Sequence, residues 1–246
     1  VIRSLITELS DCIDKNIPRM KDGTFYRIDT MWADDTFMSC PFLVRLGNIT
    51  KESKYYDETI NQLILYTEKL FIREKGVFSH IFFPKLGRAN NVPWGRGNGW
   101  VYLAFAETIE HLPENYKGKD KLCEIFKTAV EGLTDKQDDT GLWHQVLTLK
   151  DTFSETSCTA IFAIAIAKGI KIGILDKQRY LPVVKNAVDG ILKYKTDENG
   201  KIYCVNGERL NNTEVELKSL TKEEKEYLRE NTRLPEAAIE NICGID

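Results

Sequence analysis

The sequence predicts an all-α protein organised as an α/α toroid, in which pairs of helices surround a central pocket. Apolar residues recur at helical spacing over most of the chain. Turn glycines followed by a short apolar or aromatic stretch recur roughly every 60 residues, at Gly23, Gly76, Gly141 and Gly200. Two helical segments fill each interval between these glycines, so the repeating unit is a helix pair with a hairpin.

The individual helices follow from the same spacing. A first helix is predicted over 2–16, where Leu5, Ile6 and Leu9 share one face. The second runs from Asp34 to Leu46, and we expect it to stop at Gly47, because glycine commonly follows a helix. Further helices are predicted over 52–71, 97–111, 118–135, 155–173 and 177–194, with a weaker one at 234–243. Residues 206–233 are typical of a solvated loop followed by a surface helix.

No stretch rich in Pro, Gly or Ser divides the chain, so we expect one barrel domain over residues 1–246. A closed toroid normally needs six helix pairs, whereas about seven long helices are predicted here. The array is therefore expected to be incomplete, with the missing N-terminal helices preceding Val1. The oligomeric state has no signature in the sequence.

The composition excludes several classes of function. The net charge is −3, so the sequence predicts no nucleic-acid partner, and no apolar run is long enough to cross a membrane. The six cysteines are scattered singly and the three histidines form no HExxH motif, so neither a metal site nor a cofactor is predicted. We expect a cytoplasmic protein, or a periplasmic one if a signal peptide precedes this stretch.

The segment from Asn91 to Trp100 combines two tryptophans, an arginine and three glycines just before an apolar helical pattern. Glycine permits close approach of the backbone, and a helix start offers unpaired N–H groups. With Arg96 and the rings of Trp94 and Trp100, the segment suits a small, flat, anionic ligand such as a sugar acid. A helix start with a packed tryptophan explains the pattern equally well. Neither a dinucleotide fingerprint nor a phosphate-binding loop is present.

Asp34 and Asp35 stand at the start of a helix, where either could be a simple N-cap. Trp32 precedes them and an apolar helix follows, which indicates burial. Burial would raise the pKa of a carboxyl group there and let it act as a general acid. His80 and His144 occupy equivalent places in two successive hairpins, as structural residues or as pocket residues. Glu155 is predicted to cap its helix first and to line the pocket second.

Three motifs resemble the unsaturated rhamnogalacturonyl hydrolases of glycoside hydrolase family 105, and more distantly the unsaturated glucuronyl hydrolases of family 88. They are the Trp-Ala-Asp-Asp-Thr-Phe-Met segment from Trp32, the Trp-Gly-Arg-Gly-Asn-Gly-Trp segment from Trp94, and the Gly-Leu-Trp-His-Gln-Val segment from Gly141 with Glu155-Thr-Ser. The resemblance covers about residues 2–205. It implies an (α/α)6 barrel that degrades polysaccharide fragments.

The implied activity is removal of a 4,5-unsaturated uronic acid from the non-reducing end of lyase-generated oligosaccharides, including rhamnogalacturonan. Asp34 matches the catalytic aspartate of the family. Other positions match its sugar-binding residues: Trp32, His80, Trp94, Arg96 and Trp100. We also expect Asp35, Asn98 and His144 to contact the substrate. The family carries another pocket aspartate on an earlier helix. Hydration of the C4=C5 vinyl ether needs one acid that later acts as a base, and no metal.

Two other functions stay open on the sequence alone. A conventional α/α-barrel glycosidase or a sugar epimerase would share the fold, and an epimerase would use His80 and His144 as its acid–base pair. The other alternative is a non-catalytic remnant that only binds saccharides.

Overall fold

The computed structural model describes residues 2–27, 29–202 and 221–223. Seven α-helices lie in these ranges: α1 (Ile2–Lys15), α2 (Asp35–Thr50), α3 (Ser53–Leu70), α4 (Gly95–His111), α5 (Lys119–Thr134), α6 (Thr156–Lys171) and α7 (Lys177–Tyr194). All seven long helices predicted from the sequence are therefore confirmed. The helix predicted at 234–243 and most of the loop region 206–233 lie outside the described residues.

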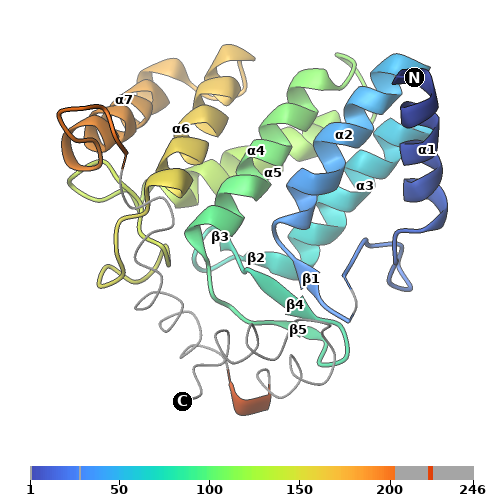
Figure 1. The fold of residues 1–246 in the computed structure, drawn as a ribbon, viewed down its shortest axis with the longest axis horizontal. Coiled ribbons are helices and arrows are strands. Elements are labelled where there is room, and N and C mark those ends of the chain that lie inside the picture. Colours follow the sequence, from blue (N-terminus) through green and yellow to red (C-terminus); the bar gives the residue numbers. More distant parts are fainter. Residues whose placement is uncertain (1, 28, 203–220, 224–246) are drawn as a thin grey trace.

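The helices form one curved array (Figure 1). α4 packs between α2 and α6, and α3, α5 and α7 pack behind α2, α4 and α6 respectively. Buried aromatic rings join the layers: Tyr102 of α4 contacts Phe126 of α5 and Phe162 of α6, with ring centroids 6.5 and 5.5 Å apart. This arrangement of helix pairs is that of an α/α toroid. None of the described helices combines the length and the apolar character that a membrane span requires.

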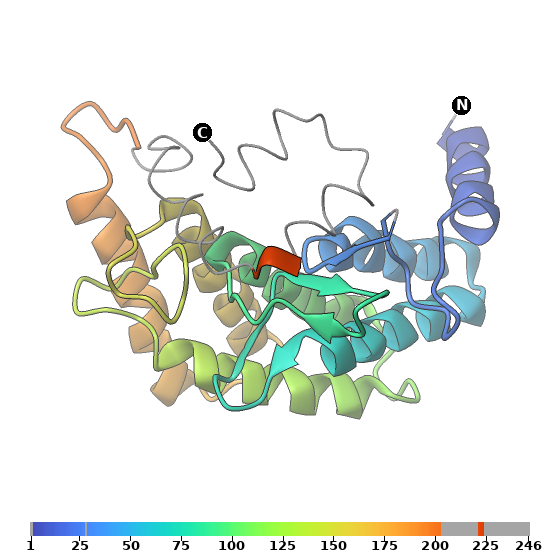
Figure 2. The ribbon, with the colours of Figure 1, turned by 90° about the horizontal axis from the view of Figure 1, so that it is seen from below.

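Short strands gather at one end of the array, facing the viewer in Figure 2. β1 (Met31–Trp32), β4 (Ile81–Phe83) and β5 (Arg88–Ala89) form one antiparallel sheet in the order β1-β4-β5. A separate hairpin joins β2 (Phe71–Ile72) to β3 (Val77–Phe78). The chain enters α2 from β1 and α4 from the segment after β5, so these helix starts lie at the strand end.

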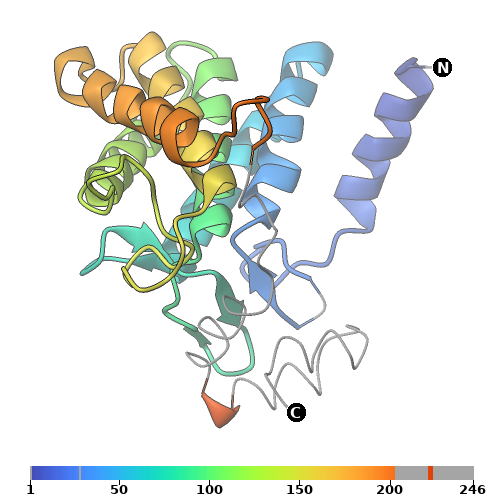
Figure 3. The same ribbon diagram turned by 60° about the vertical axis from the view of Figure 1, so that its left-hand side comes forward.

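α1 stands apart from the other helices (Figure 3). A cavity of about 470 Å³ separates it from α2 and is lined mainly by apolar side chains, among them Leu9, Phe25, Phe42 and Tyr66. The only charged residues of its wall, in the described part of the chain, are Arg27 and Asp35.

The predicted stop of α2 at Gly47 is wrong. The helix continues to Thr50 and ends where Lys51 adopts a left-handed conformation, with φ of 64°. Gly47 lies inside the helix, where a Cβ would come 2.6 Å from Cε1 of Tyr56. The glycine is needed for close packing of α2 on α3, and not for ending the helix.

Candidate active site

Strand pairing brings Asp34 and His80 together, although they are 46 residues apart in the chain. Trp32 of β1 lies opposite Ile81 of β4, and the N–H of Ala33 donates to the carbonyl of His80 at 2.8 Å. Asp34, two residues after β1, and His80, directly before β4, therefore meet at the start of α2. His80 Nε2 lies 3.1 Å from Oδ2 of Asp34.

Asp34 occupies the N-cap position of α2, yet its side chain makes no capping hydrogen bond. Its carboxylate turns to His80 instead, and both side chains are largely buried, with 18% and 6% exposed. In an ordinary cap, a side-chain oxygen would accept hydrogen bonds from the helix N–H groups. The simple capping explanation of Asp34 therefore does not describe this geometry.

The raised pKa predicted for Asp34 is wrong. Burial raises the pKa of this carboxyl, but the hydrogen bond and the charge of His80 outweigh it, helped by the charge of Arg27. The pKa of Asp34 is therefore below its ordinary value of 3.8. Asp35 behaves in the opposite way. Burial and the neighbouring Asp34 charge raise the pKa of Asp35, and the Arg27 pair only partly offsets them.

Aromatic rings surround the Asp34–His80 pair. The ring of Trp32 meets the His80 ring edge-on at a centroid distance of 4.9 Å, and Trp94 lies 4.6 Å away on a tilted plane. Gly97 makes this approach of α4 feasible. A Cβ at Gly97 would lie 3.0 Å from the Trp94 ring, 3.2 Å from His80 and 3.5 Å from Oδ2 of Asp34.

Arg96 extends the same group of residues. Its guanidinium lies over the Trp94 ring, 4.4 Å from the centroid, and Nη1 donates to Oε1 of Glu155 at 3.0 Å. The side chain of Glu155 is only 1% exposed, and it also accepts from the backbone N–H of Cys158. The predicted cap at the start of α6 is thus confirmed. The same carboxylate fixes the direction of Arg96.

Three of the residues expected to contact substrate have other partners. Trp100 packs on Phe37, with centroids 4.9 Å apart. Asn98 is fully buried, and its side-chain amide bonds to the backbone of Phe78 and Trp94. Its contact with the substrate stays a prediction. His144 has both ring nitrogens engaged: Nε2 lies 3.1 Å from Asp138, and Nδ1 pairs with the carbonyl of Thr152.

Arg27 was not among the site residues that the sequence predicted. Its Nε and Nη2 donate to Oδ1 of Asp35 at 2.8 and 2.6 Å, and its guanidinium lies 5.1 Å from the centroid of Trp32. Asp35, expected to bind substrate directly, is therefore engaged by this arginine. The only signal in the sequence is the strand-like aromatic stretch Phe25-Tyr26-Arg27 after a turn, which does not indicate a pocket.

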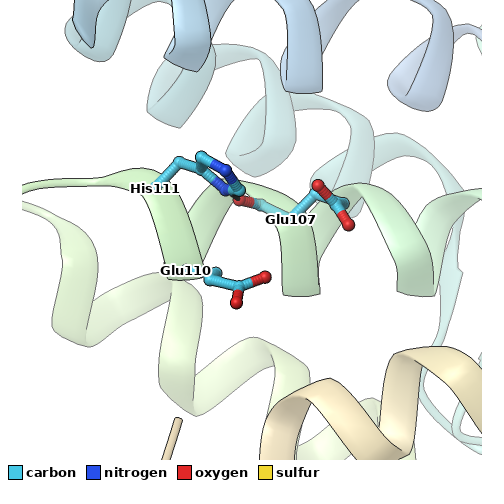
Figure 4. Close-up of side chains that lie close together, drawn as sticks. All are labelled: Glu107, Glu110 and His111. Atoms are coloured by element: carbon cyan, nitrogen blue, oxygen red, sulfur yellow. Dashed lines mark hydrogen bonds between the residues drawn. The ribbon is translucent and has the colours of Figure 1, made fainter. Parts of the chain in front are cut away.

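A second polar cluster, at the C-terminal end of α4, brings Glu107, Glu110 and His111 close together (Figure 4). Both carboxylates already have cationic partners. Glu107 pairs with Arg45 and Lys168, and Glu110 pairs with Lys168 and Lys171 at 2.6 and 2.9 Å. Nδ1 of His111 bonds to the carbonyl of Glu107. A divalent cation would have to displace these ammonium groups, so the cluster is an ion-pair network that joins α2, α4 and α6.

Glu110→Gln should therefore lower the melting temperature at neutral pH. Its bonds to Lys168 and Lys171 lower the pKa of Glu110 from 4.5 to about 2. A depressed pKa in the folded state stabilises the protein above pH 4.5, and this contribution disappears as the pH falls to about 2. Melting curves of the wild type and Glu110→Gln should converge over that range, whereas Glu114→Gln, at an exposed position beyond α4, should match the wild type throughout. A zinc-dependent rise in melting temperature that Glu110→Gln abolished would contradict the ion-pair explanation.

Comparison with known proteins gives the family. Residues 1–220 match the family model described as Glycosyl Hydrolase Family 88. The chain is 34% identical over 172 residues to an unsaturated 3S-rhamnoglycuronyl hydrolase of Alteromonas sp. (strain LOR), a match that covers 68% of this chain and 42% of that protein. It is 24% identical over 192 residues to an unsaturated rhamnogalacturonyl hydrolase of Bacillus subtilis (strain 168), covering 74% and 56% of the two chains.

Solved structures agree with this result. A glycoside hydrolase from family 105 of C. acetobutylicum ATCC 824 superimposes with a TM-score of 0.74 at 27% sequence identity, over 80% of this chain and 59% of that one. The chain thus spans about half the length of the curated and solved relatives described here. Because the family model matches residues 1–220 of its 246 residues, the chain belongs to glycosyl hydrolase family 88.

Proposed function

We propose that this chain carries the acid–base site of a hydrolase for unsaturated uronides. The activity is removal of a 4,5-unsaturated uronic acid from the non-reducing end of a lyase-generated oligosaccharide. The strongest support is the contact that the Asp34 carboxylate makes. It forms no capping hydrogen bond with α2 and pairs instead with buried His80, whose ring lies between two tryptophans. The names of the relatives favour the same class of substrate, an unsaturated uronide next to rhamnose.

In the proposed mechanism the carboxyl of Asp34 donates its proton to C4 of the vinyl ether. Positive charge develops at C5 and is shared with the ring oxygen. The Asp34 carboxylate then accepts a proton from a water whose oxygen adds to C5. The resulting hemiketal opens to a ketone at C5, and the C1–oxygen bond to the next sugar breaks. One carboxyl acts first as acid and then as base, so a second carboxylate at a fixed separation is not required.

The depressed pKa of Asp34 is compatible with this sequence of steps. Asp34 and His80 are hydrogen-bonded and can share a proton between them. A bound uronate brings a negative charge next to Asp34 and displaces water from it, and both effects raise the pKa of a carboxyl group. In this proposal substrate binding moves the proton onto Asp34. Arg96, oriented by Glu155, pairs with the uronate carboxylate, and the indole rings stack on sugar faces.

The test is an assay of the wild-type protein with oligosaccharides released by a rhamnogalacturonan lyase. Hydration of the C4=C5 bond removes its ultraviolet absorbance, so the proposal predicts a time-dependent loss of that signal. Release of the neighbouring sugar should match it mole for mole. Oligosaccharides whose terminal uronate is saturated should not be cleaved. Binding of the unsaturated oligosaccharide without loss of absorbance would favour a saccharide-binding protein, and cleavage of the saturated sugar would favour a conventional glycosidase.

A further inference from the structure

The candidate site contains a continuous row of planar groups with an arginine at each end. Neighbouring groups in the row are 5.1, 4.9, 4.6 and 4.4 Å apart, measured from ring centroids or guanidinium carbons. In order, the row is Arg27, Trp32, His80, Trp94 and Arg96. Asp34 is bonded to the central histidine. Each guanidinium therefore lies on one tryptophan, and the imidazole lies between the two tryptophans.

Each arginine is also held by a carboxylate. Asp35 binds Arg27 through Nε and Nη2, and Glu155 binds Arg96 through Nη1. These pairs leave further N–H groups on both guanidiniums, and within the described part of the chain no hydrogen bond forms from Nη1 of Arg27. The Arg27 side chain is 50% exposed, compared with 26% for Arg96. A half-exposed ion pair adds little to stability, but a two-point hydrogen bond fixes the direction of the guanidinium.

There is also space beside Arg27. The cavity of about 470 Å³ between α1 and α2 has Arg27 and Asp35 as its only charged wall residues in the described ranges. Mainly apolar side chains line the remainder, among them the rings of Phe25, Tyr26 and Phe42. Apolar rings next to an oriented guanidinium are a combination that suits a sugar ring carrying an anionic substituent.

We propose that Arg27 binds a second anionic group of the substrate, a sulfate ester or a carboxylate on the sugar that follows the unsaturated uronate. This inference rests on the proposed function, because it assumes that Asp34 acts on the terminal sugar and that Arg96 takes its carboxylate. An enzyme that removes a terminal sugar encloses that sugar and leaves the next one closer to solvent. Arg27 is the more exposed arginine, and it faces the cavity. Arg27 also binds Asp35, the residue next to Asp34, and lies over Trp32, so it is close to the reacting centre.

The first test compares wild type, Arg27→Gln and Arg19→Gln on three unsaturated disaccharides, whose second sugar is neutral, sulfated or carboxylated. Arg19 is the matched control: it lies in the same segment, pairs with Glu58 at 2.9 Å and covers the ring of Phe25 at 4.4 Å. Arg27→Gln should lower the ratio of kcat/KM for a charged over the neutral disaccharide by roughly tenfold or more, the usual effect of one lost charge-assisted hydrogen bond. The change should appear in KM, and Arg19→Gln should leave the ratio as in the wild type.

The two charged disaccharides separate the sources of the anion. A loss confined to the sulfated one identifies a sulfate site, and a loss confined to the carboxylated one identifies a carboxylate site. An equal fall on all three disaccharides would overturn the proposal, because Arg27 would then serve the terminal uronate or only position Asp34. An unchanged ratio would overturn it as well.

A binding measurement keeps this test separate from the proposed function. Calorimetric titration of Asp34→Asn and of Asp34→Asn/Arg27→Gln with the same three disaccharides requires no turnover. The inference predicts that the second substitution weakens binding of a charged disaccharide roughly tenfold more than binding of the neutral one. If the wild type cleaves none of the three, the proposed function fails, while the titration still decides whether Arg27 binds the second anion. Equal weakening for all three disaccharides would reject the assignment.

Discussion

Asp34→Asn is expected to reduce hydrolysis of an unsaturated uronide by roughly 10³-fold or more. The amide cannot donate a proton to C4 or accept one from water, so both proton transfers of the proposed reaction lose their catalyst. The loss should appear in kcat, because asparagine keeps the shape of the side chain and the surrounding rings still bind the sugar. Single-turnover and steady-state rates, followed through the absorbance of the double bond, measure the effect.

Asp22→Asn provides the matched control. Asp22 lies in the turn before Gly23, and although burial raises the pKa of this carboxyl, its bonds to Lys69 and Thr24 bring it down to about 2. Both aspartates have depressed pKa values, so each stabilises the fold above pH 3.8 and loses that contribution as the pH falls through its folded-state pKa. Both variants should melt below the wild type at neutral pH and converge with it in acid. Only Asp34→Asn should lose turnover.

Asp35 is the competing acid. Burial raises the pKa of Asp35, as a general acid requires, whereas the pKa of Asp34 is lowered by its bond to His80. The Asp35 carboxylate, however, is held by Arg27, whereas the Asp34 carboxylate pairs with His80. If Asp34→Asn retained turnover and Asp35→Asn abolished it, the roles assigned here to the two residues would have to be exchanged.

The sequence predicted the helices well because each is long and carries apolar residues at a constant period. The repeated turn glycines were sufficient to identify an array of helix pairs. All four of them, Gly23, Gly76, Gly141 and Gly200, have positive φ, between 66° and 90°. Local rules of this kind depend on a few adjacent residues, so they hold whatever the tertiary contacts are. Gly47 is the exception, because its role depends on Tyr56 of the next helix, which a local rule does not include.

The site was predicted only in part, because its geometry depends on contacts between distant segments. β1 has two residues and β4 has three, too few for a periodic pattern, yet their pairing brings His80 to Asp34. The pKa of Asp34 was predicted in the wrong direction for the same reason: burial could be inferred from the sequence, but the histidine that outweighs it could not. Motif resemblance identified Trp32, Trp94 and Arg96, whereas Arg27 lies outside those motifs and becomes visible only through its contact with Trp32.

Gly141→Ala is expected to destabilise the fold by roughly 3 kcal/mol or more, as the sum of two costs. The residue has φ of +84°, where an L side chain is strained by about 1–2 kcal/mol. Its Cβ would also lie 2.1 Å from the carbonyl oxygen of Asn186, in the backbone of α7. A backbone atom within a helix cannot rotate away, so either α7 moves or the turn does. The free energy of unfolding in urea measures the effect.

Gly23→Ala separates the two costs. Gly23 is the equivalent turn glycine of an earlier repeat, with φ of +90°, and no heavy atom lies within 4 Å of the position a Cβ would take. This variant should lose only the backbone term of about 1–2 kcal/mol. The difference in unfolding free energy between the two variants is then the cost of separating α7 from the 138–142 turn. This turn carries Asp138, the partner of His144. Equal losses of unfolding free energy would mean that α7 moves aside without cost, and that the close contact at Gly141 does not hold α7 in place.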